Sequence, residues 1–416
     1  MPLSADFANS ALPPARPDAR RGTAGFYHAA RDPDGRWWLV DPAGQPLLLR
    51  GVHGVARTAP SADAALPDAP AARLRRWGFN AIGLGPDPDP HDDGLPFLAA
   101  VEFIQSVPAI VAPGVRLPDV FNPDWSRRAA AHAAAVCAGL VASQPLVGWV
   151  TDRHLEWGHA PAPGRPSLLQ VCLSLEPGFA AYHAAWEFVL ALHAGKLESL
   201  SRAWGIAVPN KEVLRELTRS EQGIATRGYL RDEARWAREF ARRYFSVTAA
   251  AVRVVDPHHL VLGCRFAGRA GASVLAECAY PAVDVALPDW RDLPAPGVGP
   301  LAPVLAGDVA WHLESAPPPA AGGRPRRLTT VERMLRRART TLDRLARHPG
   351  VIGYFWAQWQ DEPGEQPPFA RGLVHGNGTE AREHTEVLAP FNLRAEGLHR
   401  APAPGRLTNS GRTSPA

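Results

Sequence analysis

The chain has 416 residues, of which 46% are hydrophobic, and a formal net charge of +4. That length accommodates one large domain or two ordinary ones, and that hydrophobic content excludes an intrinsically disordered chain. The positive charge comes almost entirely from scattered arginines, with no dense basic block interleaved with aromatic residues. We therefore expect no binding to nucleic acid.

The sequence also lacks the marks of export and of membrane insertion. No apolar run approaches the length of a membrane span, and the first residues lack the apolar core of a secretory signal. The cysteines, Cys137, Cys172, Cys264 and Cys278, form no Cys-x-x-Cys pair and have no histidine nearby at zinc spacing. We expect a cytoplasmic protein with free thiols, no membrane contact and no metal site.

The two ends of the chain differ in composition from its middle. Residues 1–24 are rich in Pro, Ala and Arg without periodicity, and residues 396–416 share this character. Such segments are typical of flexible tails. We expect one domain over residues 25–395.

Between these ends, short apolar segments follow one another at regular intervals along the chain. In order, the apolar segments that we predict as strands span residues 47–52, 81–84, 103–111, 146–152, 259–266, 283–290, 302–311 and 350–363. Most of them are followed by a stretch with helical periodicity. The longest helical stretch follows the fourth segment and covers residues 178–204, 211–218 and 227–255.

This alternation of apolar strands and helices predicts an α/β fold with parallel strands. Eight such units favour a (β/α)8 TIM barrel, with a helical insertion after the fourth strand. The chain has no Gly-x-Gly-x-x-Gly after the first strand and no P-loop, which argues against dinucleotide or nucleotide binding. We expect no cofactor.

In a barrel of this kind the functional residues lie at the C-terminal ends of the strands. Carboxyl groups follow the fourth and seventh predicted strands, and tryptophans follow several strands. Paired carboxylates perform glycoside hydrolysis, and flat aromatic rings stack on sugars. The candidates in chain order are His53, Asp152, Arg153, His154, Glu156, Arg265, Trp290, Asp308, Trp311, Trp356 and Trp359.

Several of these segments resemble one known family when taken together. They include "LRRWGFNAIGLG", "LVGWVTDRHLEWG", "LESLSRAWG", "DPHHLVLGCRF" and "GVIGYFWAQWQDEP". They are similar to the agarase-like β-glycosidases, which belong to the clan of retaining (β/α)8-barrel glycoside hydrolases. The resemblance covers residues 25–392 and implies action on β-linked glycosides or oligosaccharides.

The resemblance also implies that both catalytic glutamates are substituted. After the fourth strand the family carries Asp-Asn-Glu-Leu-x-Trp-Gly, with the Glu as acid/base. In this chain the matching segment begins at Asp152, and Arg153 and His154 stand at the Asn and Glu positions. Asp308 stands where the family has its nucleophilic Glu after the seventh strand.

Three alternatives remain open for the chemistry. Asp308 keeps a carboxylate, and either His154 or Glu156 supplies the acid, since residues two apart on an extended strand point the same way. The chain is then a glycoside hydrolase with altered catalytic residues. Alternatively it is a non-hydrolytic carbohydrate-binding protein, or His154 acts as a general base in a different reaction on the same barrel.

The remaining candidates are expected to bind substrate, each with a structural alternative. Asp152 could instead tie down loops, and Arg153 could pair with Asp152 or Asp308. Arg265 is expected to donate to a sugar or a carboxylate. His53 and the tryptophans Trp290, Trp311, Trp356 and Trp359 could contact sugar or pack in the core.

Overall fold

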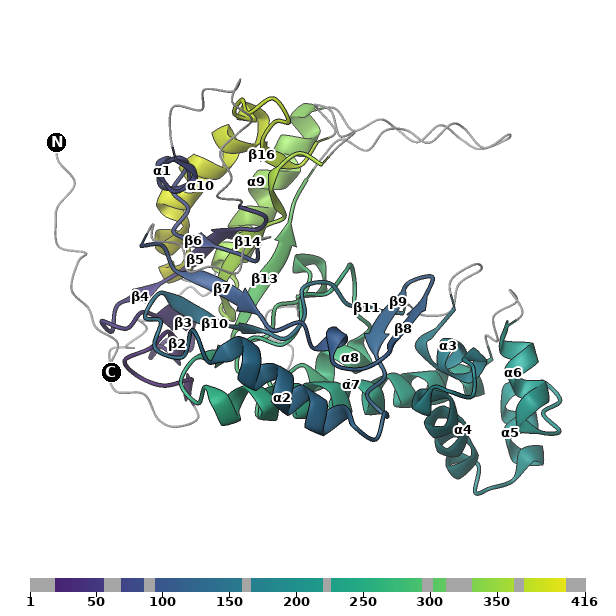
Figure 1. Ribbon diagram of the computed structural model, residues 1–416. Helices are drawn as coiled ribbons and strands as arrows, with labels where there is room; N and C mark the ends of the chain where they lie inside the picture. The colour runs from purple at the N-terminus through teal and green to yellow at the C-terminus, as the bar shows by residue number, and fades with distance from the viewer. Residues whose placement is uncertain are drawn as a thin grey trace, which may run out of the picture.

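The computed structural model describes residues 19–55, 69–85, 94–158, 166–219, 226–293, 302–311, 331–362 and 370–401. Its centre is a seven-stranded sheet with the order β12-β10-β7-β6-β5-β14-β13, in which all neighbours are parallel. The strands are β5 (Leu49–Val52), β6 (Ala81–Ile82), β7 (Phe97–Ala100), β10 (Leu146–Val150), β12 (Leu260–Val261), β13 (Val304–Val309) and β14 (Val351–Trp356). The sheet curls, with helices on its outside (Figure 1). The predicted α/β fold with parallel strands is confirmed.

Residues 283–289 contact both edge strands of this sheet. On one side the Asp284 amide donates to the Val261 carbonyl at 2.9 Å. On the other, Ala286 and Asp289 form parallel bridges to Val304 and Gly307 of β13. The segment predicted as the sixth strand therefore lies between β12 and β13, although it forms only isolated bridges.

The predicted position of the third strand, residues 103–111, was wrong. The strand of the main sheet is β7, which lies before residues 103–111. Those residues form the short helix η2 (Phe103–Gln105) and strand β8 (Ala109–Ala112) of a separate small sheet with β9 (Val115–Pro118) and β11 (Glu156–Trp157). Glu102 turns the chain between them in a left-handed conformation with φ of 67°.

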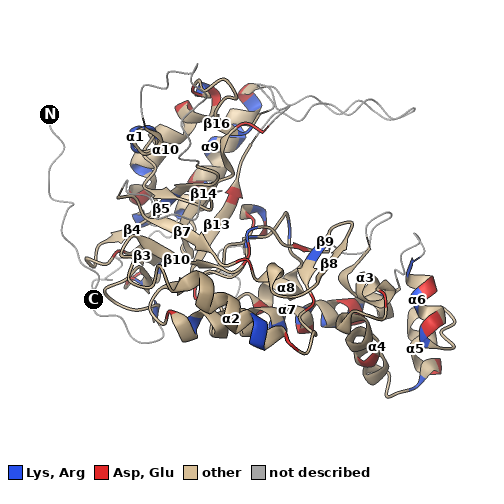
Figure 2. Cartoon of the chain, viewed as in Figure 1, with Lys and Arg blue, Asp and Glu red and all other residues tan. Residues whose placement is uncertain are grey.

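Helices cover the outside of the sheet in two groups (Figure 1). One group contains α1 (Pro70–Arg76), α9 (Val331–Arg347) and α10 (Arg382–Arg400), and the other contains α2 (Trp125–Cys137) and α7 (Arg227–Val255). The charged residues are concentrated on helices such as α6 and α9 and on loops, whereas the sheet is almost free of them (Figure 2). Strands buried on both faces are typical of parallel sheets, which explains their continuous apolar sequences.

A lobe of helices follows β10 and projects away from the sheet (Figure 1). It consists of α3 (Leu168–Ser174), α4 (Ala180–Leu192), α5 (Leu197–Trp204) and α6 (Lys211–Arg219). Helices α3, α4 and α5 pack on the long helix α7, which leads back to the sheet. The helical stretch after the fourth predicted strand is therefore present.

The remaining elements lie at the two ends of the sheet. Strands β1 (Arg20–Arg21), β2 (His28–Arg31), β3 (Trp37–Val40) and β4 (Pro46–Leu47) form an antiparallel sheet, and β15 (Gln358–Gln360) pairs with β16 (Gly372–Val374). Helices α8 (Ala272–Glu277) and η3 (Trp290–Asp292) follow β12 and the bridging segment. Strand β1 lies within the expected N-terminal tail, and α10 extends beyond the expected boundary at residue 395. None of the helices in the described part of the chain is long and apolar enough to span a membrane.

Candidate functional site

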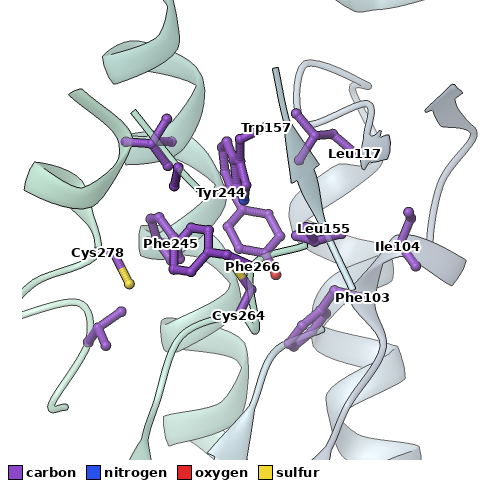
Figure 3. Close-up of a cluster of buried hydrophobic side chains, with 14 of the residues drawn as sticks. Phe103, Ile104, Leu117, Leu155, Trp157, Tyr244, Phe245, Cys264, Phe266 and Cys278 are labelled. Carbon is purple, nitrogen blue, oxygen red and sulfur yellow. The ribbon is translucent and has the colours of Figure 1, made fainter. Parts of the chain in front are cut away.

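In the segment after β10, successive side chains point to opposite sides of the backbone. Leu155 and Trp157 are buried, whereas His154 is exposed and Glu156 is half-buried. Trp157 stacks on Phe245 of α7 at a centroid distance of 5.6 Å, and Figure 3 shows both rings in the same buried cluster. This packing turns His154 and Glu156 toward the end of the sheet, as the period of two in an extended strand requires.

His154 and Glu156 line one pocket together with Arg265 and Asp308. The pocket has a volume of about 480 Å³ and lies at the C-terminal ends of the strands. Trp290 of η3 also lines it. The three residues expected to be catalytic thus lie around a single cavity.

Asp308 is held in an unusual conformation at the end of β13. Its φ is 50°, in the left-handed region that non-glycine residues rarely adopt, and the pairing register with β14 shifts between Ala306 and Val309. The Arg265 guanidinium donates to Asp308 Oδ1 from Nε at 2.9 Å and from Nη2 at 2.6 Å. Arg265 therefore donates to a carboxylate, and both of its bonds are on the same oxygen.

The other charged groups of the pocket also form pairs, with one exception. Arg291 binds Asp289 through Nε at 2.8 Å and Nη2 at 2.5 Å, and Arg371 lies 3.7 Å from Glu362. Glu156 forms no ion pair or side-chain hydrogen bond with any other described residue. Among the lining carboxylates of the described residues, Glu156 is the one with neither oxygen bound to another side chain.

Asp152 is not among the residues that line the pocket. Its side chain is fully buried, with Oδ1 accepting from the Ile104 amide at 2.9 Å and Oδ2 accepting from the Tyr244 hydroxyl at 2.5 Å. Burial raises the pKa of Asp152 to about 8, against the opposing effect of these hydrogen bonds. The residue ties η2 and α7 to the end of β10, which is the structural alternative that we had considered.

Arg153 pairs with neither Asp152 nor Asp308, which excludes the structural alternative that we had considered for it. Its Nε lies 2.8 Å from Glu102 Oε1, and its Nη1 donates to the Gly85 carbonyl at 2.6 Å. Asp308 instead pairs with Arg265, which approaches it from the end of β12. Arg153 joins two loops beside the sheet and is not among the residues that line the pocket.

His53 packs at the end of β5 and is only 1% exposed. Its Nδ1 accepts from the Leu84 amide at 3.0 Å, and its ring stacks on Phe355. Burial, followed by the charge of Arg265, lowers the pKa of His53 well below its ordinary value. The expected contact with substrate does not arise in this conformation, because the ring is covered.

Of the expected tryptophans, Trp290 lines the pocket and the others pack elsewhere. Trp356 is fully buried, and Trp311 packs on it edge to face at 4.5 Å. Trp359 is 6% exposed and lies against Trp77. A buried indole face has no surface for a sugar, so Trp356 and Trp359 belong to the core, whereas Trp311 is half-buried at its edge.

The sequence analysis missed several residues of the pocket wall. Glu362, Arg291 and Arg371 line it. Glu362 stands at the end of the eighth predicted strand, where a search for polar side chains would have found it. No local pattern marks Arg371.

Within the described ranges, no group of three His, Cys, Asp or Glu side chains could hold a metal ion.

Comparison with known proteins supports the resemblance found in the sequence. No family profile matches the chain. β-Agarase A of Vibrio sp. (strain JT0107) is 23% identical over 342 residues, which cover 64% of this chain and 34% of that protein. β-Agarase B of the same organism is 25% identical over 219 residues, which cover 51% of this chain and 23% of that protein. The chain thus spans about a third or less of the curated relatives that it matches.

The fold is shared with solved agarase structures. The crystal structure of one agarase superposes with a TM-score of 0.66 at 18% identity, covering 92% of this chain and 67% of that one. At this identity the superposition shows a common fold alone. The chain thus resembles the agarase-like glycoside hydrolases both in sequence and in fold.

Proposed function

We propose that this protein hydrolyses β-linked glycosides or oligosaccharides in the pocket lined by Glu156 and Asp308. The single observation that supports this most is that two carboxylates, each following a different strand, line one pocket in a fold shared with agarases. The names of the related proteins, both β-agarases, point to agarose as the substrate class. Paired carboxylates around a sugar-sized pocket are the chemical requirement for this reaction.

In this mechanism Asp308 acts as the nucleophile, or as the base that activates water. Because Arg265 binds only Oδ1, Oδ2 is the oxygen available for that step. Glu156 donates a proton to the leaving oxygen and, in a retaining reaction, takes one from water in the second step. His154 lines the same pocket, but a protonated imidazole beside an oxocarbenium-like transition state is electrostatically unfavourable, so we assign the acid to Glu156.

The scaffold of this site is, in our proposal, a closed (β/α)8 barrel. Residues 283–289 would be its sixth strand, since they bond to β12 on one side and to β13 on the other. The lobe α3–α6 would be an insertion between the fourth strand and α7. Closure would bring Trp290 and Arg291 to the same end of the barrel as Asp308.

A second function is favoured by the contact between Arg265 and Asp308. A carboxylate bound by two guanidinium nitrogens is a weak nucleophile, and aspartate is one methylene shorter than the family's glutamate. The protein would then bind carbohydrate without cleaving it. Binding without turnover distinguishes this function from the first.

The test is a turnover and binding assay with aryl β-glycosides and agarose-derived oligosaccharides. We expect Asp308→Ala and Glu156→Gln each to reduce turnover about a hundredfold or more, because each removes a group that acts in the transition state. Glu332→Gln, in an exposed ion pair on α9, is the matched control. Wild-type turnover that is unchanged in Asp308→Ala would refute the catalytic assignment, and binding without any turnover would establish the second function.

A further inference from the structure

One of the two lysines of the chain makes specific contacts in the helical lobe. Lys211 begins α6, in the lobe that projects away from the sheet (Figure 1). Its Nζ donates to His183 Nδ1 of α4 at 3.0 Å and lies 4.2 Å from the centre of the Tyr182 ring. Lys211 is half-buried and His183 is exposed, so a small molecule in solution can reach this pair of nitrogens.

The ring of His183 presents a lone pair to this lysine. On its other side, His183 Nε2 donates to the Pro177 carbonyl at 2.8 Å. A carbonyl oxygen only accepts, so in the neutral ring the proton is on Nε2 and Nδ1 has the lone pair that accepts from Lys211. The same carbonyl stabilises the imidazolium once Nδ1 has taken a proton. His183 is therefore placed to act as a base toward the Lys211 ammonium.

The surroundings of Lys211 affect its charge in opposite directions. Partial burial lowers the pKa of Lys211 below its ordinary value, whereas the charges of Glu187 and Glu212 raise it. Arg215, one turn further along α6, lies over the same tyrosine ring but is paired with Glu176. Because burial outweighs the two carboxylates, the neutral amine is a larger fraction of Lys211 than of a fully exposed lysine, and the neutral amine is the nucleophilic form.

We propose that Lys211 and His183 form a nucleophilic pair that is acylated at Lys211 Nζ by small activated acyl donors of the acyl phosphate class. His183 Nδ1 takes a proton from the Lys211 ammonium and passes it to solvent, and the neutral Nζ attacks the acyl carbon. An N–C bond forms, and the bond from the acyl carbon to the phosphate oxygen breaks with its electron pair on the phosphate. The phosphate takes up the second proton that the nitrogen loses as the amide forms. The product is a neutral acyl-lysine without the charge over the Tyr182 ring.

The test compares the two lysines within one molecule. The wild-type protein is incubated with acetyl phosphate, and mass spectrometry of proteolytic peptides measures the initial rates of acetylation at Lys211 and Lys196. Lys196 is exposed and its side chain binds no other described residue, so it provides the ordinary reactivity of a surface lysine. We expect Lys211 to react about tenfold faster or more, since a positioned base contributes about a hundredfold or more in a closed active site and less at an exposed one.

Substitutions separate the base from simple exposure of the lysine. His183→Asn keeps a hydrogen-bond acceptor but supplies no base, and should reduce the rate at Lys211 to about that at Lys196. Glu187→Gln removes a charge that stabilises the ammonium, and should increase the rate at Lys211. His258→Asn, at an exposed histidine after α7, is the matched control and should leave the ratio of the two rates unchanged. Circular dichroism verifies that each variant is folded.

Two results would overturn the proposal. One is equal rates of acetylation at the two lysines of the wild type, and the other is a folded His183→Asn variant that keeps the full wild-type ratio. The pair lies in the lobe and shares no residue with the pocket beside Asp308. Neither result therefore bears on the proposed function, and the absence of glycoside turnover does not bear on the acylation of Lys211.

Discussion

Single residues show how strongly the surroundings of a carboxylate decide what it can do. Asp308 and Asp152 both follow parallel strands, yet Asp308 faces a pocket and Asp152 is fully buried. Burial raises the pKa of Asp152 to about 8, and its two oxygens accept from the Ile104 amide and the Tyr244 hydroxyl, so this residue holds loops together. The same residue type thus lines a pocket in one place and holds loops together in the other.

Asp256 has a third role, as a buried acceptor at the end of α7. It accepts from Trp149 Nε1 at 2.8 Å, from His259 Nδ1 at 2.7 Å and from the amides of His258 and His259 at 3.1 Å. Burial alone would raise the pKa of Asp256, but the hydrogen bonds from His259 and Trp149 outweigh it and lower the pKa to about 2. This carboxylate fastens α7 to β10.

We expect Asp256→Ala to reduce the free energy of unfolding by about 3 kcal/mol or more, because it leaves several buried donors without a partner. Urea denaturation measures the change. Asp343→Ala, which breaks an exposed ion pair with Arg394, is the control and should change stability by less than about 1 kcal/mol. Equal effects of the two substitutions would contradict the role of Asp256.

The pH dependence of Asp256 has a definite sign. Since its folded pKa of about 2 lies below the ordinary value of 3.8, the carboxylate contributes stability above pH 3.8. That contribution disappears as the pH falls through about 2. We expect the difference in stability between wild type and Asp256→Asn to be present just above pH 3.8 and to shrink as the pH falls through about 2. A difference that grows with falling pH would refute this assignment.

At the scale of elements, helix packing depends on where the backbones approach most closely. At Gly228, in the first turn of α7, a Cβ atom would lie 2.1 Å from the Ala203 carbonyl oxygen of α5. That oxygen belongs to the backbone and cannot move alone. The absence of a side chain at Gly228 therefore sets the distance between the lobe and α7.

We expect Gly228→Ala to force α5 away from α7 and to destabilise the protein by about 1–3 kcal/mol. Relative to the wild type, amide hydrogen exchange in Gly228→Ala should increase more in the lobe α3–α6 than in the parallel sheet. Gly178→Ala is the matched control, because a Cβ there meets nothing within 4 Å. Unchanged exchange in the lobe of Gly228→Ala would show that the helices are not in close contact.

At the scale of the whole molecule, two hydrophobic cores meet at the sheet. The inner core contains residues from every strand of the main sheet, and the outer core lies between the sheet and the helices. Phe355 belongs to the inner core, and its ring fills the space left by glycines on two neighbouring strand segments. Cβ atoms at Gly51 and Gly83 would lie 2.2 and 2.9 Å from that ring.

We expect Phe355→Ala to reduce stability by about 3–5 kcal/mol, since it opens a cavity where the strands converge. Leu393→Ala, on α10 with 85% of the residue exposed, is the control and should have an effect within about 0.5 kcal/mol. Urea denaturation of both variants checks this. Similar urea midpoints for the two variants would mean that Phe355 does not stabilise the sheet.

Much of this architecture could be predicted from local patterns, because strands buried on both faces must be apolar along their whole length. The position of the third strand could not, since residues 97–111 are apolar almost throughout. Contacts with residues distant in the sequence decide which of these residues form the strand. One such contact is the hydrogen bond from the Ile104 amide to Asp152. The tryptophans pose the same problem, because an indole ring has the same sequence signal whether it is buried, as at Trp356, or lines a pocket, as at Trp290.

The sequence by itself determined the parallel α/β alternation, the helical stretch after the fourth strand and the likeness to agarases. These depend on apolar periodicity and on short motifs, which are local. Only the tertiary structure decided that Arg265, not Arg153, pairs with Asp308, and that Glu156 lines the same pocket. Those relations join residues from different strands, and the curl of the sheet sets which strand ends face each other.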